Sequence, residues 1–494
     1  MSKSGLAKVS RRRFNLETVV FSAQQEVTVP AGLKIPVSTQ YVLQPLLVIP
    51  REKVIVQYSP GKVRVQGQLA GFVSFVERDE SVGTLPVSPT EFIASFVAPH
   101  AVQGARLEAD ISLEGVEVDR GDGEANIIAY LRVAILALKQ EDTELVTAVT
   151  DSTLSVESQG IKLQHIIKDA EVEKNLSIAL PLIEGKLLAT DLCLGNLGWQ
   201  VYEGKLSGQG VALVKAYYLT GVGGLNIAEG AADFELEIDF AAPEISDSTL
   251  QCVPVKTTIV TAAEGQEYQV LIKARAAGYQ EQTGEYITNI IGADSLKKTI
   301  QLRNRVGESE FKLTLDGQCQ FPVDPQSIDL ALPKIRLIET EAMDERVQVR
   351  GLLSLHFYYT AEDEQRRVLV QEEEFSHFLE VKGCARGFSV KAWAWPEQGI
   401  YTHEKYTVPI LLRVEVVDDV VHDTVTDIHV VDPNFVPINA SVILYVMGKD
   451  DSLFSVARKF NISQDRLLEY NGLSGVAELY PGQKLLIPIF ELKY

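Results

Sequence analysis

The chain has 494 residues, and its 46 Lys and Arg against 67 Asp and Glu give a formal net charge of −21. Hydrophobic residues make up 46% and charged residues 23% of the sequence, close to ordinary globular values, which excludes disorder of the whole chain and a low-complexity fibre. The length predicts about three or four domains. The acidic balance argues against a nucleic-acid-binding protein, because binding to phosphates needs a basic face.

The N-terminal segment carries one basic cluster, Arg11-Arg12-Arg13. We expect residues 1–20 to form a solvated basic tail, with a weak contact to an anionic membrane surface as the alternative. The apolar run that follows, Val19-Val20-Phe21, is shorter than the roughly 7–15 residues of a signal peptide. No stretch approaches the roughly 18 apolar residues of a transmembrane helix. The sequence therefore predicts synthesis in the cytoplasm, without a signal peptide and without a transmembrane segment.

Three segments of the chain repeat the same landmarks in the same order. Gly67, Gly210 and Gly351 lie 143 and 141 residues apart, and an aromatic residue follows each of them eight positions later. The aromatic landmarks, in the order of their distance from the glycines, are Phe75, Tyr218, Tyr359, Phe92, Phe234, Phe375, Tyr130, Tyr268 and Tyr406. Because several landmarks at fixed spacing indicate an internal repeat, we predict three copies of one unit, over residues 21–146, 165–283 and 306–420.

Each copy has the sequence pattern of β-strands. In the first copy, Val63, Val65 and Leu69 alternate with polar residues, a period of two that is typical of a half-buried strand. A glycine inside such a strand indicates a bulge or a close backbone approach. Short strands separated by turn residues predict a β-sandwich or small barrel. The polar stretches Gln140–Thr147 and Gln280–Lys297 are the expected joins between the copies.

No pattern of residues indicates catalysis or a cofactor. The sequence has no Gly-x-Ser-x-Gly, Walker or His-Glu-x-x-His motif, and its four cysteines are too far apart for a Cys-x-x-Cys pair, so buried thiols are expected. The acidic runs Glu362–Glu364 and Glu372–Glu374 are interpreted as exposed edges rather than as catalytic carboxylates. We therefore expect a protein that is not an enzyme and has no catalytic residue, metal or cofactor.

The stretch after the third copy is acidic and carries two histidines. Its polar residues alternate with valines and isoleucines and suggest ligands for a divalent ion: His422, Asp423, Asp427, His429 and Asp432. A single strand offers ligands along a line and not around a point, so we prefer the interpretation of an acidic linker over residues 421–441.

From about residue 442 the period-two pattern gives way to a strand, two helices and a second strand. Leu453 and Val456 fall on one face of the first helix, with Asp451 or Ser452 as its expected N-cap. A second helix is predicted over Ser463–Tyr470 and ends at an Asn-Gly pair, as a C-cap should. The last strand is predicted within Leu479–Pro488.

This segment, residues 442–490, resembles a LysM domain. The resemblance rests on Tyr445-Val446, on Asp451 to Ala457, on Asn471-Gly472-Leu473 and on Pro481 to Pro488. The family usually has Gly-Asp-Thr directly before Leu, whereas Lys449 and Asp450 intervene here, so we expect a reshaped first loop. The resemblance implies a groove for N-acetylglucosamine chains between this loop and the one before the final strand. The implied glycan-binding or partner-binding residues are Asp451, Ser452, Leu453, Phe454, Asn471, Gly472, Leu473, Pro481 and Ile487.

The repeated units resemble the SPOCS domain, the β-rich unit of spore-coat proteins in endospore-forming bacteria. The closest match is Val347–Tyr359, with its Val-x-Val-x-Gly core and tyrosine-bearing strand. Together with one terminal LysM domain, the repeats are similar in arrangement to spore morphogenesis proteins. The resemblance implies a non-enzymatic scaffold at the spore coat or forespore surface. Its implied partners are other spore-coat and morphogenetic proteins, and its LysM domain contacts protein as well as glycan.

The predicted fold class is mainly β: three tandem β-sandwich or barrel-like SPOCS-type repeats and a small C-terminal α+β LysM domain of βααβ order. The alternative function is a wall-associated protein that binds peptidoglycan through its N-acetylglucosamine chains. Repeated β units with edge strands also suit a homo-oligomer or a self-assembling filament. An enzyme with an unrecognised site in the middle copy is the remaining alternative.

Overall fold

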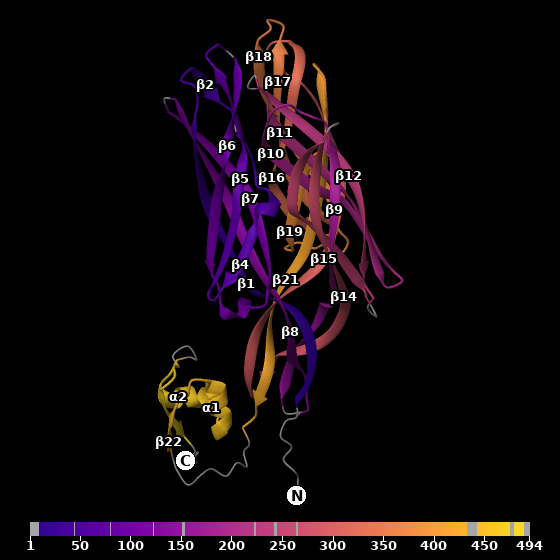
Figure 1. Ribbon diagram of the computed structural model, residues 1–494. Helices are drawn as coiled ribbons and strands as arrows, with labels where there is room; N and C mark the ends of the chain where they lie inside the picture. Colours follow the sequence, from indigo (N-terminus) through magenta and orange to yellow (C-terminus); the bar gives the residue numbers. More distant parts are fainter. Residues whose placement is uncertain are drawn as a thin grey trace.

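The computed structural model describes residues 9–43, 45–79, 81–121, 123–150, 154–221, 224–241, 245–262, 265–431, 442–474 and 479–488. It is mainly β, with a small C-terminal module that contains the two α-helices of the described chain, and this confirms the predicted fold class. The long strands run along the long axis of the molecule, and the C-terminal module lies near one end (Figure 1). No helix of the described residues is long and apolar enough to cross a membrane.

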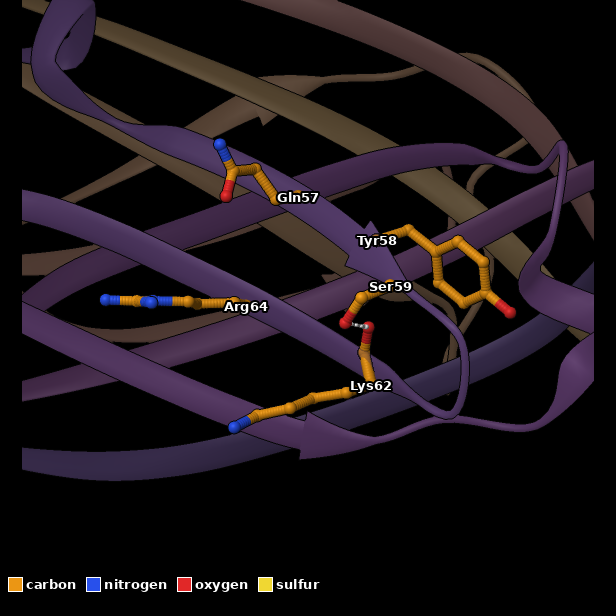
Figure 2. Close-up of a pocket in the computed structure, with 5 residues that line it drawn as sticks. All are labelled: Gln57, Tyr58, Ser59, Lys62 and Arg64. Carbon is orange, nitrogen blue, oxygen red and sulfur yellow. Dashed lines mark hydrogen bonds between the residues drawn. The ribbon is translucent and has the colours of Figure 1, made fainter.

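Unit 1 is a two-sheet sandwich of antiparallel strands. One sheet has the order β1-β8-β7, made of β1 (Val9–Lys34), β8 (Glu124–Val149) and β7 (Arg106–Gly121), and a pairing of Thr18 with Leu302 continues it into the first sheet of unit 3. The other is built on β5 (Lys62–Glu77), flanked by β6 (Val82–Val97) and by the short strands β2 (Thr39–Val42), β3 (Leu46–Val48) and β4 (Ile55–Ser59). Two short 3-10 turns, η1 (Arg51–Lys53) and η2 (His100–Val102), complete the unit. The β4–β5 hairpin borders an open hollow on the outside of this sheet (Figure 2).

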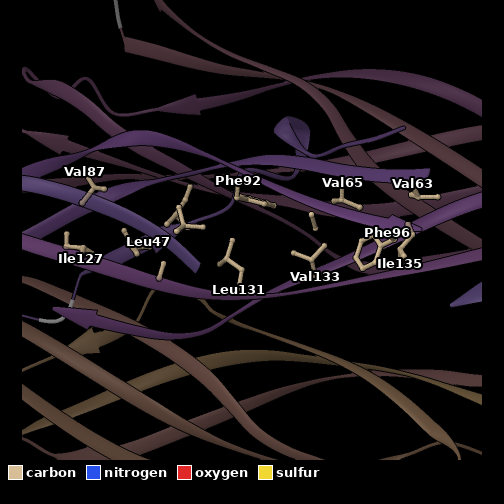
Figure 3. Packing of buried hydrophobic residues seen from close by; sticks show 14 of the residues in the cluster. Leu47, Val63, Val65, Val87, Phe92, Phe96, Ile127, Leu131, Val133 and Ile135 are labelled. Carbon is tan, nitrogen blue, oxygen red and sulfur yellow. The ribbon is translucent and has the colours of Figure 1, made fainter. Parts of the chain in front are cut away.

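The core of unit 1 lies between its two sheets. Val65 and Phe92 from one sheet pack against Leu131 and Val133 from the other (Figure 3). These residues alternate along their strands with polar residues that face outward, as the period-two pattern predicts.

Units 2 and 3 repeat the strand order of unit 1. Unit 2 has the sheets β13-β14-β9 and β10-β11-β12, and unit 3 has β19-β21-β15, with β20 paired to β21, and β16-β17-β18. The strands of unit 2 are β9 (Ser155–Leu180), β10 (Lys186–Tyr202), β11 (Lys205–Leu219), β12 (Leu225–Asp239), β13 (Asp247–Ala262) and β14 (Gly265–Ile291). Those of unit 3 are β15 (Asp294–Gln318), β16 (Pro325–Met343), β17 (Arg346–Ala361), β18 (Arg366–Glu380), β19 (Ser389–Pro396), β20 (Ile400–Tyr401) and β21 (Lys405–His429).

The repeated glycines are explained by the aromatic residues that follow them. Gly67, Gly210 and Gly351 lie on the central strands β5, β11 and β17, and each is the direct cross-strand partner of a repeated phenylalanine. A Cβ at these glycines would lie 2.5, 2.7 and 2.5 Å from the ring of Phe92, Phe234 and Phe375. The pairing with the phenylalanine-bearing strand is regular at each glycine, whereas the strand on the other side shifts register at Gly210 and Gly351, so the structure shows a close approach at all three glycines and a bulge beside two of them. Each ring lies over the strand where a side chain would otherwise stand.

The opposite face of the central strands joins the three units to one another. Five positions after each repeated glycine stand Phe72, Lys215 and His356, all buried. The Lys215 ammonium of unit 2 lies 6.0 Å from the Trp395 ring of unit 3, and His356 of unit 3 shares a small hollow with Pro45 and Ser74 of unit 1. Residues of all three units also form one buried cluster: Phe72, Ala189, Tyr217 and Leu332. The units therefore pack as one body.

A second junction is formed where the long strands extend beyond the sandwiches. We call this region the stem: residues 9–18 of β1, 139–149 of β8, 155–166 of β9, 279–291 of β14, 294–305 of β15 and 418–429 of β21. Its two buried clusters draw residues from every unit: Phe14, Leu16, Leu145, Tyr286, Ile300 and Leu302 in one, and Val146, Ile287, Ile290, Val425 and Ile428 in the other. Figure 1 shows the stem below the sandwiches, at the label β8.

The stem corrects several sequence-based expectations. Residues 9–20 are not a basic tail but part of β1, and residues 421–429 are not a linker but the end of β21. The expected joins Gln140–Thr147 and Gln280–Lys297 are mostly paired strand. Over much of these stretches, polar residues that face outward alternate with residues that enter the stem core, so the polar half of a strand resembled a linker, whereas Arg11, Arg12 and Arg13 are all exposed on β1. Residues 1–8 and 432–441 of these expected segments lie outside the described residues.

Candidate binding site in the C-terminal module

The C-terminal module has the order strand, helix, helix, strand. It consists of β22 (Val442–Val446), α1 (Leu453–Phe460), α2 (Gln464–Asn471) and β23 (Lys484–Pro488), with β22 antiparallel to β23. The helices begin and end as the sequence predicts. The Ser452 hydroxyl accepts a hydrogen bond from the amide of Ser455 at the start of α1, and Gly472 ends α2 in the left-handed conformation.

Two loops lie side by side at one end of this module. The first, residues 447–452, joins β22 to α1, and the second joins α2 to β23. The Met447 amide donates to the Gln483 carbonyl at 2.9 Å, and the Gly482 amide donates to the Met447 carbonyl at 2.8 Å. These backbone bonds hold the two loops against each other, so exposed groups of both can contact one ligand.

Asp451 closes the first loop from within. Its carboxylate accepts a hydrogen bond from the Tyr445 hydroxyl at 2.7 Å and another from the Gly448 amide at 2.7 Å. Both bonds favour the charged form, the one from Tyr445 most, and so hold the pKa of Asp451 below its ordinary value. The two extra residues before Asp451 are thus accommodated by a turn that Asp451 itself stabilises.

Asn471 braces the end of α2 against β23. Its amide nitrogen donates to the carbonyls of Leu467 and Leu486, at 2.8 Å each, and its amide oxygen accepts from the Leu486 amide at 2.7 Å. These three bonds use both donors and the oxygen of the side chain. The position of Asn471 in the family motif therefore has a structural explanation.

The predicted binding residues separate into three groups. Leu453, with 1% of its surface exposed, Phe454 and Ile487 are buried, so their side chains offer no surface to a ligand; the hydrophobic face of α1 and the inward face of β23 form the core. The polar side chains of Asp451, Ser452 and Asn471 are engaged in hydrogen bonds inside the module. Gly472 and Pro481 are exposed beside the two loops, and Leu473 is half-buried against the core.

Exposed residues that the sequence analysis did not select also belong to these loops. Tyr480 has 62% of its surface exposed, and its backbone is fixed because its amide donates to the Gln483 side chain at 3.0 Å. Lys449 and Asp450 are exposed in the first loop. The available signal for Tyr480 is an aromatic residue placed directly before the Pro-Gly turn.

The module is attached to the stem at the end of α1 remote from the first loop. Arg458, in the last turn of α1, forms an ion pair with Asp427 of β21, which also binds Arg11 of β1 at 2.7 Å. The Gln464 amide at the start of α2 donates to the Asp294 carboxylate of β15 at 2.7 Å. These contacts fix the module on the stem through the turn between its helices.

The histidine-rich end of β21 does not form the alternative metal site. His422 is buried and its ring nitrogen contacts the Tyr286 hydroxyl at 2.5 Å, whereas Asp423 points outward and accepts from Thr299 at 2.6 Å. Asp427 is occupied by two arginines, and His429 is buried. Asp432 lies outside the described residues. Within the part of the chain that the structure describes, no three potential ligands converge.

The four cysteines are free thiols, at least partly buried, as expected. Burial raises the pKa of the Cys193 thiol to about 12 and that of Cys252 to about 11, which keeps both in the unreactive protonated form. The acidic runs are not fully solvated: Glu372 accepts from Ser354 at 3.0 Å and Glu373 accepts from the Tyr406 hydroxyl, so both stabilise unit 3.

Comparison with known families identifies the C-terminal module. Residues 445–488 match the family model of the LysM domain, so the βααβ module on the stem is a LysM domain. The matched stretch is less than a tenth of the chain and does not extend to the three β units. No curated protein and no solved structure matches the chain.

Proposed function

We propose that this chain is a non-enzymatic binding protein whose LysM domain binds N-acetylglucosamine-containing glycan, such as peptidoglycan. The observation that carries the proposal is the LysM domain at residues 445–488, whose two loops are hydrogen-bonded together and expose an aromatic side chain. The body of three packed units then acts as a rigid scaffold that holds the domain.

The exposed groups of the two loops suit a sugar ring. The Tyr480 ring offers an apolar face against which the C–H face of a pyranose can stack. Lys449, Asp450 and the exposed backbone around Gly448 and Gly472 offer hydrogen bonds to hydroxyl and acetamido groups. Asp451 and Asn471 act indirectly in this proposal, by holding the loops in position.

A scaffold of the endospore envelope is the more specific form of the proposal. The resemblance of the repeats to the SPOCS domain supports it, with other spore-coat and morphogenetic proteins as partners and the LysM domain as the part that recruits or anchors. The contacts among the three units bury the outward face of each second sheet at one end only, around Phe72, Tyr217 and Leu332, and the exposed outer surface that remains is available to a partner, a homo-oligomer or a filament.

The experiment that tests glycan binding is a sedimentation assay of the full chain with purified peptidoglycan, with soluble N-acetylglucosamine oligomers as competitors. Tyr480→Ala should weaken binding about tenfold, the usual loss for an exposed aromatic anchor at a binding site. Tyr202→Ala is the matched control, because Tyr202 is a tyrosine with 68% exposure on β10 of unit 2. Absence of saturable binding, or equal losses in both variants, contradicts the proposal.

A further inference from the structure

The outer face of unit 1 carries two cations in a protein of net charge −21. Lys62 and Arg64 lie two positions apart on β5, so their side chains leave the same face of the sheet, and both are exposed. Together with Gln57, Tyr58 and Ser59 of β4 they line a hollow of about 440 Å³. Figure 2 shows the ends of Lys62 and Arg64 extending toward the same side.

The strands on either side of β5 supply no carboxylate to these cations. Gln57 and Ser95 lie opposite Arg64, and Ser59 and Val97 lie opposite Lys62. Within the described residues, neither cation forms an ion pair.

The other two units show how a cation at the position of Lys62 is neutralised by its neighbours. In unit 2, Lys205 occupies the position of Lys62, and Asp239 lies opposite it where unit 1 has Val97. The Lys205 ammonium binds Glu237 at 2.9 Å, and unit 1 has Ser95 at the position of Glu237.

Unit 3 also compensates its cation at this position. Arg346 lies opposite Glu380, and its guanidinium lies 4.4 Å from the centre of the Phe378 ring. Unit 1 thus differs from both other copies, because it lacks the opposing carboxylate and has a second cation, Arg64, where the others have Ser207 and Gln348.

We propose that this cationic hairpin face, made of Gln57, Ser59, Lys62 and Arg64, binds the carboxylate or phosphate groups of an anionic polymer. The guanidinium of Arg64 matches either group with two parallel hydrogen bonds, and Lys62 adds a point charge. The amide of Gln57 offers a further donor, whereas the Ser59 hydroxyl donates to the Lys62 carbonyl at 3.5 Å and holds the turn. The acidic remainder of the protein repels such a polymer, which confines the contact to this face.

The proposal deepens the proposed function, because cell-envelope polymers carry such groups beside their N-acetylglucosamine. Anion binding by this face can be tested separately from glycan binding, because the two test polymers contain no N-acetylglucosamine. A failure of peptidoglycan binding and a failure of anion binding are therefore distinguishable.

The test measures fluorescence anisotropy of labelled polyglutamate and labelled poly(glycerol phosphate) with the full chain at low salt. Two variants copy unit 2 into unit 1: Arg64→Ser introduces the residue at position 207, and Ser95→Glu introduces the residue at position 237. Each should weaken binding at least about tenfold, the value of one charge-assisted contact. Lys205→Ser changes the net charge equally, because each variant lowers it by one, and should leave binding unchanged.

Every outcome decides the proposal. Losses in both unit-1 variants with an unchanged Lys205→Ser protein support it, and the probe that binds more tightly identifies carboxylate or phosphate as the preferred group. Absence of binding by either probe overturns it, as does an equal loss in Lys205→Ser. Circular dichroism confirms that each variant is folded. All three positions are exposed to solvent, and Ser95→Glu adds a side chain without removing a contact of Arg64.

Discussion

Replacing Gly351 with Ala should destabilise unit 3 by displacing a single aromatic ring. A Cβ at this position would lie 2.5 Å from the tip of the buried Phe375 ring and 3.1 Å from the Arg336 carbonyl oxygen. Ordinary contact begins near 3.4 Å, so the ring must retreat by about 1 Å into a packed core. Overpacking of this size costs about 1–3 kcal/mol of the free energy of unfolding.

The assay is urea denaturation followed by tryptophan fluorescence, because Trp393 and Trp395 both lie on β19 of unit 3. In a Phe375→Leu background the ring no longer opposes the added methyl and only the close Arg336 carbonyl remains, so the loss caused by Gly351→Ala should be smaller by at least about 0.5 kcal/mol. Gly160→Ala is the control, since nothing lies within 4 Å of its Cβ position; it should be neutral or slightly stabilising. A Gly351→Ala protein as stable as the control, or a loss that persists without the phenylalanine, refutes the explanation of the repeated glycines.

Three further predictions concern charges and hydrogen bonds. Burial raises the pKa of Asp191 to about 6, above its ordinary value of 3.8. Ionisation of this carboxyl therefore lowers the free energy of unfolding, by up to about 3 kcal/mol, as the pH rises from about 4 to above 6. In urea titrations, the stability of the Asp191→Asn variant relative to the natural protein should therefore be greater at pH 7.5 than at pH 4. An equal difference in the free energy of unfolding at both pH values contradicts this. Asn471→Ala removes three hydrogen bonds and should loosen β23 by about 2–3 kcal/mol, seen as faster hydrogen exchange of the Leu486 amide; unchanged exchange would show that the brace is dispensable. Asp427→Asn should weaken the attachment of the LysM domain to the stem by about 1 kcal/mol, measured by hydrogen exchange across the turn between α1 and α2, whereas Asp423→Asn, which affects only an outward contact with Thr299, should not.

Local patterns in the sequence were sufficient to predict the strands and the module. The spacing of Gly67, Gly210 and Gly351 predicted three copies of one β-rich unit, and the structure repeats one strand order three times; the alternation around Val63 and Val65 predicted which residues enter the core. The caps at Ser452 and Gly472 predicted the ends of the two helices of the LysM domain. In each case the determining contacts lie close in sequence or between adjacent strands.

What depends on distant contacts could not be predicted in this way. Phe14 is apolar within a charged segment, and its place in the stem cluster with Tyr286 and Ile300 explains why this segment belongs to a strand. Nothing in the pattern of β11 shows that Lys215 faces another unit. The binding residues implied by the LysM resemblance mixed core with surface, because motif positions such as Leu453 and Asn471 are retained for folding. The motif residues that carry the resemblance do not include Tyr480, although its side chain is exposed beside the two loops.

The fusion of three equivalent units into one chain has a consequence for stoichiometry. A trimer of separate chains would display every surface three times and would fall apart on dilution, whereas the covalent arrangement keeps its central contacts at any protein concentration. It also allows Phe72, Lys215 and His356 to differ at one repeated position, so each unit has its own neighbour. The described residues thus hold one LysM domain and the one proposed cationic hairpin face, at fixed places on a body of three similar units. The two sites give the molecule a polarity, because a partner at the LysM domain and a partner at the hairpin face are held at fixed positions relative to each other.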